Sequence, residues 1–143
     1  MEQKINQTLT AILERDKNIQ LAYLFGSFVK KKNRFGSDLD IAIYFKQEPD
    51  VLAIGALVIE LQDAAGCKID IVALNKLDVS NPALAYSIIS EGIIVHCKDE
   101  NLGKEFVRST MLRYFDFKPI IDFFDLNFNI RLTKLEYALT KVK

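Results

Sequence analysis

Apolar residues at the start of the chain are spaced as on a helix, and the spacing then changes to that of a strand. The helical positions are Ile5, Leu9, Ile12 and Leu13. Because they recur every three or four residues, they predict an amphipathic first helix that ends in the charged stretch 14–17. Residues 21–25 are an unbroken apolar run that stops at Gly26-Ser27, which predicts a buried strand followed by a tight turn.

Residues 38–45 (DLDIAIYF) alternate with a two-residue period and predict a second strand. Side chains alternate across a strand, so the two sets of positions lie on opposite faces. One face carries Asp38, Asp40, Ala42 and Tyr44, and the other carries Leu39, Ile41, Ile43 and Phe45. We therefore expect the two acids to face away from the core.

The remainder of the chain alternates between helical and strand-like patterns. A helix is predicted over residues 50–65 and is closed by Gly66. Residues 68–73 (KIDIVA) predict a third strand in which Asp70 and Val72 share one side. The last predicted elements are a helix over 81–92, a short edge or terminal strand over 93–97, and helices from about 99 onward that Pro119 interrupts.

This order of elements predicts an α+β fold, an α/β sandwich in which a small mixed β-sheet is backed by helices. The chain has 143 residues, of which 50% are hydrophobic, and this supports one compact domain with a substantial core. Within that domain we expect a core at residues 1–98 and a C-terminal helical extension at residues 99–143 that packs on the core.

Charge and composition exclude several classes of function. The formal net charge is +0, so we expect no direct binding of nucleic acid. The first 16 residues mix apolar residues with charges and amides, which argues against a signal peptide or membrane span, and we expect a cytoplasmic protein without membrane contact. Cys67 and Cys97 have no CxxC spacing and are interpreted as buried free thiols. His96 has no ligand spacing around it and is interpreted as structural or surface-exposed.

The pair Asp38 and Asp40 is the first indication of chemistry. At a rise of roughly 3.3 Å per residue, acids at i and i+2 on a strand share a face with their Cα atoms about 7 Å apart. Like charges at this range repel unless a cation compensates, and Mg²⁺ is usually held by one or two carboxylates plus substrate phosphates. Asp70, with the same alternation on the next strand, is the expected third acid, which would ligate a second ion and help deprotonate an acceptor hydroxyl.

The Gly26-Ser27 turn suits the binding of phosphate. Glycine lets the backbone approach a triphosphate closely, and Ser27 offers a hydroxyl and the N–H groups of a following helix start. The ten residues between the turn and the acids include four cations that could neutralise phosphate charge: Lys30, Lys31, Lys32 and Arg34. A plain turn with an N-cap serine and a solvated basic loop are the structural alternatives.

Gly26-Ser27, a gap of ten residues and Asp38-Leu39-Asp40 together resemble the signature of the polymerase-β-type nucleotidyltransferase superfamily. Over residues 20–75, and with Asp70 in KIDIV, the chain is similar to the minimal members of that superfamily. The resemblance implies a polymerase-β-like fold, a Gly-Ser turn that contacts the triphosphate, metal-binding acids at Asp38 and Asp40, and a third acid at Asp70. It also implies Mg²⁺ as cofactor and ATP as substrate.

The loop after the turn departs from the family pattern. Many members have Ala-Arg-Gly after Gly-Ser-x, whereas Val29-Lys30-Lys31 stands here. Lys30 keeps the positive charge and is the expected phosphate contact of this loop. It cannot form the bidentate contacts that an arginine makes with phosphate.

Residues 111–119 (MLRYFDFKP) resemble the C-terminal segment of the antitoxins that are paired with HEPN-domain ribonuclease toxins. Those antitoxins are similar nucleotidyltransferases that attach AMP to a tyrosine of the toxin. The resemblance therefore implies a HEPN-type toxin as partner. The tail is unusually aromatic, and we expect part of its surface to cover that partner or a second copy of the chain.

These observations predict a Mg²⁺-dependent nucleotidyltransferase that transfers AMP from ATP to a hydroxyl, and a tyrosine of a toxin is the expected acceptor. Two other functions remain open. The chain could be a binding-only antitoxin that masks its partner without catalysis. It could also transfer a nucleotide to a small hydroxylated molecule, although no additional acceptor domain is visible in the sequence.

Overall fold

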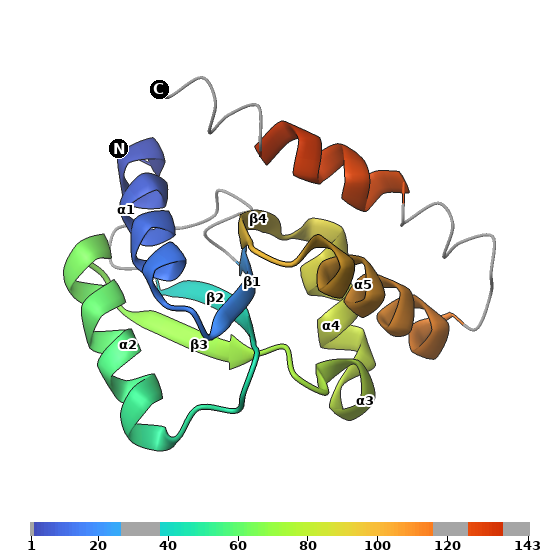
Figure 1. Ribbon diagram of the computed structural model, residues 1–143, viewed down its shortest axis with the longest axis horizontal. Coiled ribbons are helices and arrows are strands. Elements are labelled where there is room, and N and C mark those ends of the chain that lie inside the picture. Colours follow the sequence, from blue (N-terminus) through green and yellow to red (C-terminus); the bar gives the residue numbers. More distant parts are fainter. Residues whose placement is uncertain (1, 27–37, 116–125, 136–143) are drawn as a thin grey trace.

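The computed structural model describes residues 2–26, 38–115 and 126–135. Its elements are α1 (Glu2–Arg15), β1 (Ile19–Phe25), β2 (Leu39–Phe45), α2 (Val51–Ala65), β3 (Ile69–Ala73), α3 (Leu77–Ser80), α4 (Pro82–Glu91), β4 (Ile93–Cys97) and α5 (Glu100–Tyr114). Residues 126–135 form a further helix, called the C-terminal helix below. Figure 1 shows the sheet between two sets of helices. None of the helices in these ranges has the length and apolar character needed to cross a membrane.

The sheet is four-stranded within the described ranges, in the order β3-β2-β1-β4. β1 pairs antiparallel with β2 and with β4, whereas β2 and β3 run parallel. A parallel pair needs a crossover connection, and α2 supplies it. The predicted α+β class with a small mixed sheet is therefore confirmed, and β4 is an edge strand as expected.

Each face of the sheet is covered by its own hydrophobic cluster. The first cluster lies under α3, α4, α5 and the C-terminal helix and includes Tyr23, Ala42, Ile88, Phe106 and Phe128. The second lies under α1 and α2 and includes Leu13, Leu24, Ile41, Leu61 and Val95. Ile19 and Leu21 belong to different clusters although they are two residues apart, because the pairing of β1 shifts register between them.

The acid-bearing face of β2 is not a solvent face, which corrects the expectation that the acids face away from the core. Ala42 is fully buried in the first cluster, and the ring of Tyr44 meets that of Phe106 edge-on at 5.9 Å. Helices that follow β3 cover this face, and the alternation within one strand cannot reveal them. The face is closed at Ala42 and partly open towards its two ends, at Asp38 and Asp40 and at Tyr44.

Predicted helix boundaries are confirmed where the capping residues are strong. The carboxylate of Asp50 accepts from the N–H of Ala53 (2.7 Å), and Gly66 ends α2 in the left-handed conformation at φ 71°. Asn81 caps α4 by accepting from the N–H of Leu84 (3.2 Å). The four-residue helix α3 is not predicted, because it is too short to show a helical period.

Neither Cys67 nor Cys97 is in a disulfide, as predicted, but both are half-buried rather than buried. Each lies at or next to the end of an element, where apolar neighbours in the sequence do not guarantee enclosure. His96 is buried in β4, and its Nε2 donates to the carbonyl of Ile19 (3.3 Å). Burial lowers the pKa of His96. Its surroundings support the structural interpretation.

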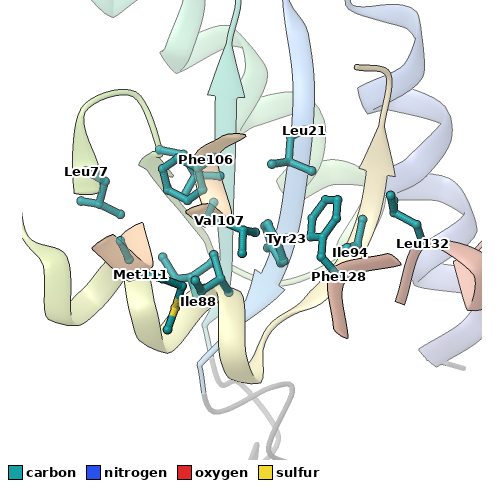
Figure 2. Packing of buried hydrophobic residues seen from close by; sticks show 14 residues of the cluster. Leu21, Tyr23, Leu77, Ile88, Ile94, Phe106, Val107, Met111, Phe128 and Leu132 are labelled. Carbon is teal, nitrogen blue, oxygen red and sulfur yellow. The ribbon is translucent and has the colours of Figure 1, made fainter. Parts of the chain in front are cut away.

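α5 and the C-terminal helix pack on the same cluster as β1 (Figure 2). The ring of Phe128 lies against Gly103, where a Cβ atom would be 2.6 Å from the ring carbon Cζ. The C-terminal helix thus rests on α5 at a position without a side chain. Pro119, the predicted break in the helical tail, lies outside the described residues.

Candidate active site

Three strand ends meet at one edge of the sheet. Because β1 runs antiparallel to β2, the end of β1 lies beside the beginning of β2, and β3 begins beside β2 as well. Asp40 connects the three strands, since its Cα is paired with Phe25 of β1 on one side and with Asp70 of β3 on the other. The fold therefore brings the predicted acids together with Gly26, which follows Phe25.

Asp40 and Asp70 lie beside each other on one face of the sheet. Paired positions on neighbouring parallel strands are about 4.8 Å apart, and their side chains project to the same face. Asp40 is half-buried and Asp70 is exposed, so the pair extends from the rim of the first cluster to solvent. Asp38 is also half-buried and lies one residue before β2, not inside the strand as predicted.

Gly26 is in close contact with the carboxylate of Asp40. It has a left-handed backbone with φ 82°, and a Cβ atom on this residue would lie 2.2 Å from Oδ2 of Asp40. A side chain is therefore excluded here for two reasons, backbone conformation and space. Glycine in the Gly-Ser turn was expected to let the chain approach a phosphate, and the contact with the acid is an additional reason for it.

The charges of the three acids act on one another. Burial raises the pKa of Asp40, and the charges of Asp70 and Asp38 raise it further. This is the pattern produced by carboxylates that crowd one partly enclosed place. Perturbed carboxylates of this kind are typical of functional sites, although structural groups can show them too.

Carboxylate oxygens at this edge are the ligand type that Mg²⁺ prefers. No group of three or more His, Cys, Asp or Glu side chains in the described ranges forms a ready-made metal centre. Mg²⁺ is usually held, however, by one or two carboxylates together with waters and substrate phosphates. The neighbouring carboxylates of Asp40 and Asp70 fit that mode of binding, because an ion between them would relieve their repulsion.

Cys67 adds a thiol to the surroundings of Asp38, a neighbour that was not predicted from the sequence. Burial raises the pKa of the Cys67 thiol, and the charge of Asp38 raises it further. The N–H of Leu39 donates to the carbonyl of Lys68 (2.8 Å), which joins the beginnings of β2 and β3 next to these two side chains. The sequence signal for this neighbour was the position of Cys67 directly before the predicted third strand.

Ser27 and Lys30, the other two predicted phosphate contacts, lie outside the described residues, as does the whole basic stretch 30–34. Their roles remain predictions. Of the predicted site residues, the structure therefore places Gly26, Asp38, Asp40 and Asp70, and it brings these four to one edge of the sheet.

Residues 7–101 match the family described as Polymerase beta, Nucleotidyltransferase. The match covers more than half of the chain and includes all four strands together with Gly26 and the three acids. The chain therefore belongs to this nucleotidyltransferase family.

Two relatives come from the archaeon Methanocaldococcus jannaschii. One carries the provisional name protein adenylyltransferase MJ0128 and is 32% identical over 84 residues, which are 59% of this chain and 84% of the relative. The other, provisionally named protein adenylyltransferase MJ0435, is 27% identical over 77 residues, covering 54% of this chain and 80% of the relative. The chain is similar to both over most of their length.

Several solved structures have the same fold. A chain in the complex of tri-AMPylated Shewanella oneidensis HEPN toxin with MNT antitoxin matches with a TM-score of 0.63 and 24% identity, covering 85% of this chain and 97% of that one. A chain of the toxin–antitoxin complex MntA–HepT gives 0.62 and 23%, covering 84% and 96%. A toxin–antitoxin structure with AMP-PNP gives 0.57 and 18%, covering 96% and 94%. At these identities the likeness establishes the fold alone.

Proposed function

We propose that this chain is a Mg²⁺-dependent protein adenylyltransferase that transfers AMP from ATP to a tyrosine hydroxyl of a HEPN-type toxin and thereby acts as its antitoxin. The observation that carries the proposal is the juxtaposition of Gly26, which directly follows β1, with Asp40 of β2 and Asp70 of β3. A glycine directly beside paired carboxylates supports a triphosphate site next to a cation site. The family of the chain supplies the class of reaction.

Asp38, Asp40 and Asp70 are the residues that would hold Mg²⁺. When bound, the ion would neutralise charge on the triphosphate and on the leaving pyrophosphate. The crowding that raises the pKa of Asp40 supports this assignment, since a cation is the natural compensation for it. Gly26, with Ser27 and Lys30 after it, would seat the phosphates.

The transfer itself is a substitution at the α-phosphorus of ATP. The acceptor hydroxyl oxygen forms a bond to that phosphorus, and the bond between the phosphorus and the bridging oxygen of the β-phosphate breaks, so that pyrophosphate leaves. Asp70, the most exposed of the three acids, would accept the hydroxyl proton. Holding the two reactants in line is the main contribution of the protein in this scheme.

The identity of the acceptor rests on the relatives and on the surface of the chain. The relatives are named for protein adenylylation, and one structural neighbour is a chain in the complex of a tri-AMPylated HEPN toxin with MNT antitoxin. This chain exposes large apolar side chains in its C-terminal part, and those on α5 and the C-terminal helix are Leu112, Tyr114, Leu126 and Ile130. Such side chains are suited to anchoring a protein partner.

The decisive experiment is the intact mass of the HEPN-type partner after incubation with this chain, ATP and Mg²⁺. We expect mass increments of whole AMP groups, located on tyrosine by peptide mapping, and no increment with Asp40→Asn. A partner that is bound and silenced without any increment would favour the binding-only antitoxin. Modification of a small hydroxylated molecule with an unmodified partner would favour the third alternative.

The boundary between a core at 1–98 and an extension at 99–143, the cytoplasmic location and a possible homo-oligomer remain predictions. Limited proteolysis would test the first. Mass photometry or sedimentation of the free chain would test the last.

A further inference from the structure

Arg131 of the C-terminal helix reaches into the first cluster beside β1, one of the two inner strands of the sheet. Its guanidinium carbon lies 5.5 Å from the centroid of the Tyr23 ring, and its Nη1 donates to the carbonyl of Ile89. The side chain is half-buried in spite of its charge. A cation in such a place is costly unless specific contacts compensate, and the Tyr23 ring and the carbonyl of Ile89 are two such contacts.

Tyr23 is fully buried, and its hydroxyl makes no hydrogen bond to any described residue. Figure 2 shows it inside the first cluster, near Ile94, Val107 and Phe128. Burial raises the pKa of Tyr23, and the charge of Arg131 opposes that rise. Arg131 therefore interacts electrostatically with Tyr23 and also binds the end of α4 through the carbonyl of Ile89.

The second contact of Arg131 is to α4 where that helix meets β1. Ile89 lies in the last turn of α4, which ends at Gly92. The backbone of Gly92 is packed on β1 so closely that a Cβ atom there would lie 3.1 Å from the carbonyl oxygen of Leu24 and 3.2 Å from the Tyr23 ring. Arg131 thus joins the C-terminal helix, the end of α4 and the second half of β1.

This junction lies on the acid-bearing face of the sheet, further along the strands from the candidate active site. Tyr23 precedes Gly26 by three residues, roughly 10 Å along an extended strand. On the neighbouring strand, Ala42 is paired with Tyr23 and Asp40 with Phe25. Gly26 has no spare room against the carboxylate of Asp40. A small displacement of β1 would therefore be transmitted to the turn and to the acid.

We infer that Arg131 is a positioning residue, which fixes β1 against α4 so that Gly26 is held in register with Asp40 for nucleotide transfer. The buried face of the C-terminal helix would then support the turn at Gly26, independently of any partner that binds the exposed face of the same helix. Arginine suits this role better than lysine, because its planar group can cover a ring and donate to a carbonyl at the same time. The inference rests on the proposed function.

The test compares Arg131→Met, Arg131→Lys and the control Lys134→Met, which removes an exposed cation three residues further along the same helix. AMP transfer to the HEPN-type partner is measured with saturating ATP and Mg²⁺, well below the melting midpoints of all variants. We expect kcat to fall about tenfold in Arg131→Met with the KM for the partner unchanged, since small misplacements of reacting groups cost up to about a hundredfold. Arg131→Lys should fall in between, and Lys134→Met should match the wild type.

Two results would overturn the inference. An unchanged kcat in Arg131→Met, with only a lower melting midpoint, would make Arg131 merely structural. A raised KM for the partner with unchanged kcat would make it a docking residue. If Arg131→Met is too unstable to assay, Arg131→Lys decides alone, and a wild-type kcat in that variant counts against the inference.

Failure of the proposed function can be told apart from failure of this inference. If the wild type transfers no AMP, the proposed function is wrong, and the increase in melting temperature caused by ATP with Mg²⁺ becomes the readout. Arg131→Met should then lose most of that increase while Lys134→Met keeps it. An undiminished increase in Arg131→Met would overturn the inference.

Discussion

The backbone of Gly26 and the carboxylate of Asp40 touch, with room for no further atom between them: a Cβ on residue 26 would lie 2.2 Å from Oδ2 of Asp40. The contact ties the turn that would bind the triphosphate to the acid that would bind its cation. A substitution at either residue is therefore expected to displace the other. Matched control positions for both residues exist elsewhere in the chain.

Gly26→Ala should destabilise the protein and abolish nucleotide binding. Residue 26 has φ 82°, and a left-handed L-residue costs about 1–2 kcal/mol, to which the clash with Asp40 adds. Gly66→Ala is the control, because Gly66 has φ 71° with no neighbouring atom within 4 Å of a Cβ. Thermal melts with and without ATP and Mg²⁺ should show a comparable backbone penalty in both, with loss of the ligand-induced increase only in Gly26→Ala. An intact increase in Gly26→Ala would contradict the site.

Asp40→Asn should leave the fold intact and, without metal, should not lower stability at pH 7. The folded pKa of Asp40 is raised above its ordinary value of 3.8. The stability contributed by this group is therefore fully present below that ordinary value and is lost as pH rises through the raised folded pKa. Asparagine does not ionise, so the variant does not lose this stability as pH rises. Its melting midpoint should therefore change less between pH 4 and pH 7 than that of the wild type.

The same variant, and Asp38→Asn, should lose AMP transfer and most of the stabilisation by ATP and Mg²⁺. A ligand that binds only the folded state stabilises it by mass action, so the loss reports on binding directly. Asp63→Asn, which alters an exposed acid of α2, should behave as the wild type in both assays. Full transfer activity in either site variant would remove the assignment of these acids.

Gly103→Ala should destabilise the protein by about 1–3 kcal/mol, the usual range for overpacking. The new methyl group would meet the ring of Phe128, which is 3% exposed and cannot move aside without disturbing the cluster. Gly55→Ala is the matched control on an open helix surface and should stabilise by about 0.5–1 kcal/mol. Urea unfolding of both variants measures the difference, and equal midpoints would show that the C-terminal helix is not seated on α5.

Ile130→Glu should weaken binding of the HEPN-type partner by about tenfold or more, the effect of losing one buried apolar anchor. Ile130 is 45% exposed on the C-terminal helix, and Ile59→Glu alters a 61% exposed position on α2, across the sheet. Calorimetric titration with the partner should separate the two variants. The stabilisation by ATP and Mg²⁺ should be unchanged in both, so a loss of it in Ile130→Glu would show a folding defect in place of a docking defect.

The sequence alone supports a large part of this picture, because strong local signals decide it. The alternation of residues 38–45 and 68–73 identifies β2 and β3, and caps such as Asp50 and Gly66 fix the boundaries of α2. The spacing of Gly26 and the acids indicates the chemistry before any geometry is known. Local pattern, turn chemistry and charge agree here, and such agreement makes elements predictable.

Contacts between residues that lie far apart in the chain cannot be predicted from these local patterns. The helices that bury Ala42 follow β3, so the closed face of β2 cannot be read from β2 itself. The contact of Arg131 with Tyr23 joins residues more than a hundred positions apart, and no periodicity records it. The half-buried state of Cys67 depends on how the beginnings of β2 and β3 meet, which is a property of the assembled sheet.

The parallel pairing of β2 with β3 determines the order in which the residues of the candidate site come together during folding. Gly26 directly follows β1, and Asp40 lies in the antiparallel neighbour β2. The two residues can meet early, because few residues separate them in the sequence. Asp70 joins them only after α2 has formed the crossover and docked on the sheet, which is a slower, less local event. A chain that is still emerging from the ribosome before residue 70 therefore carries Gly26, Asp38 and Asp40 without Asp70. Under the proposed function it becomes competent for transfer only when the third acid joins.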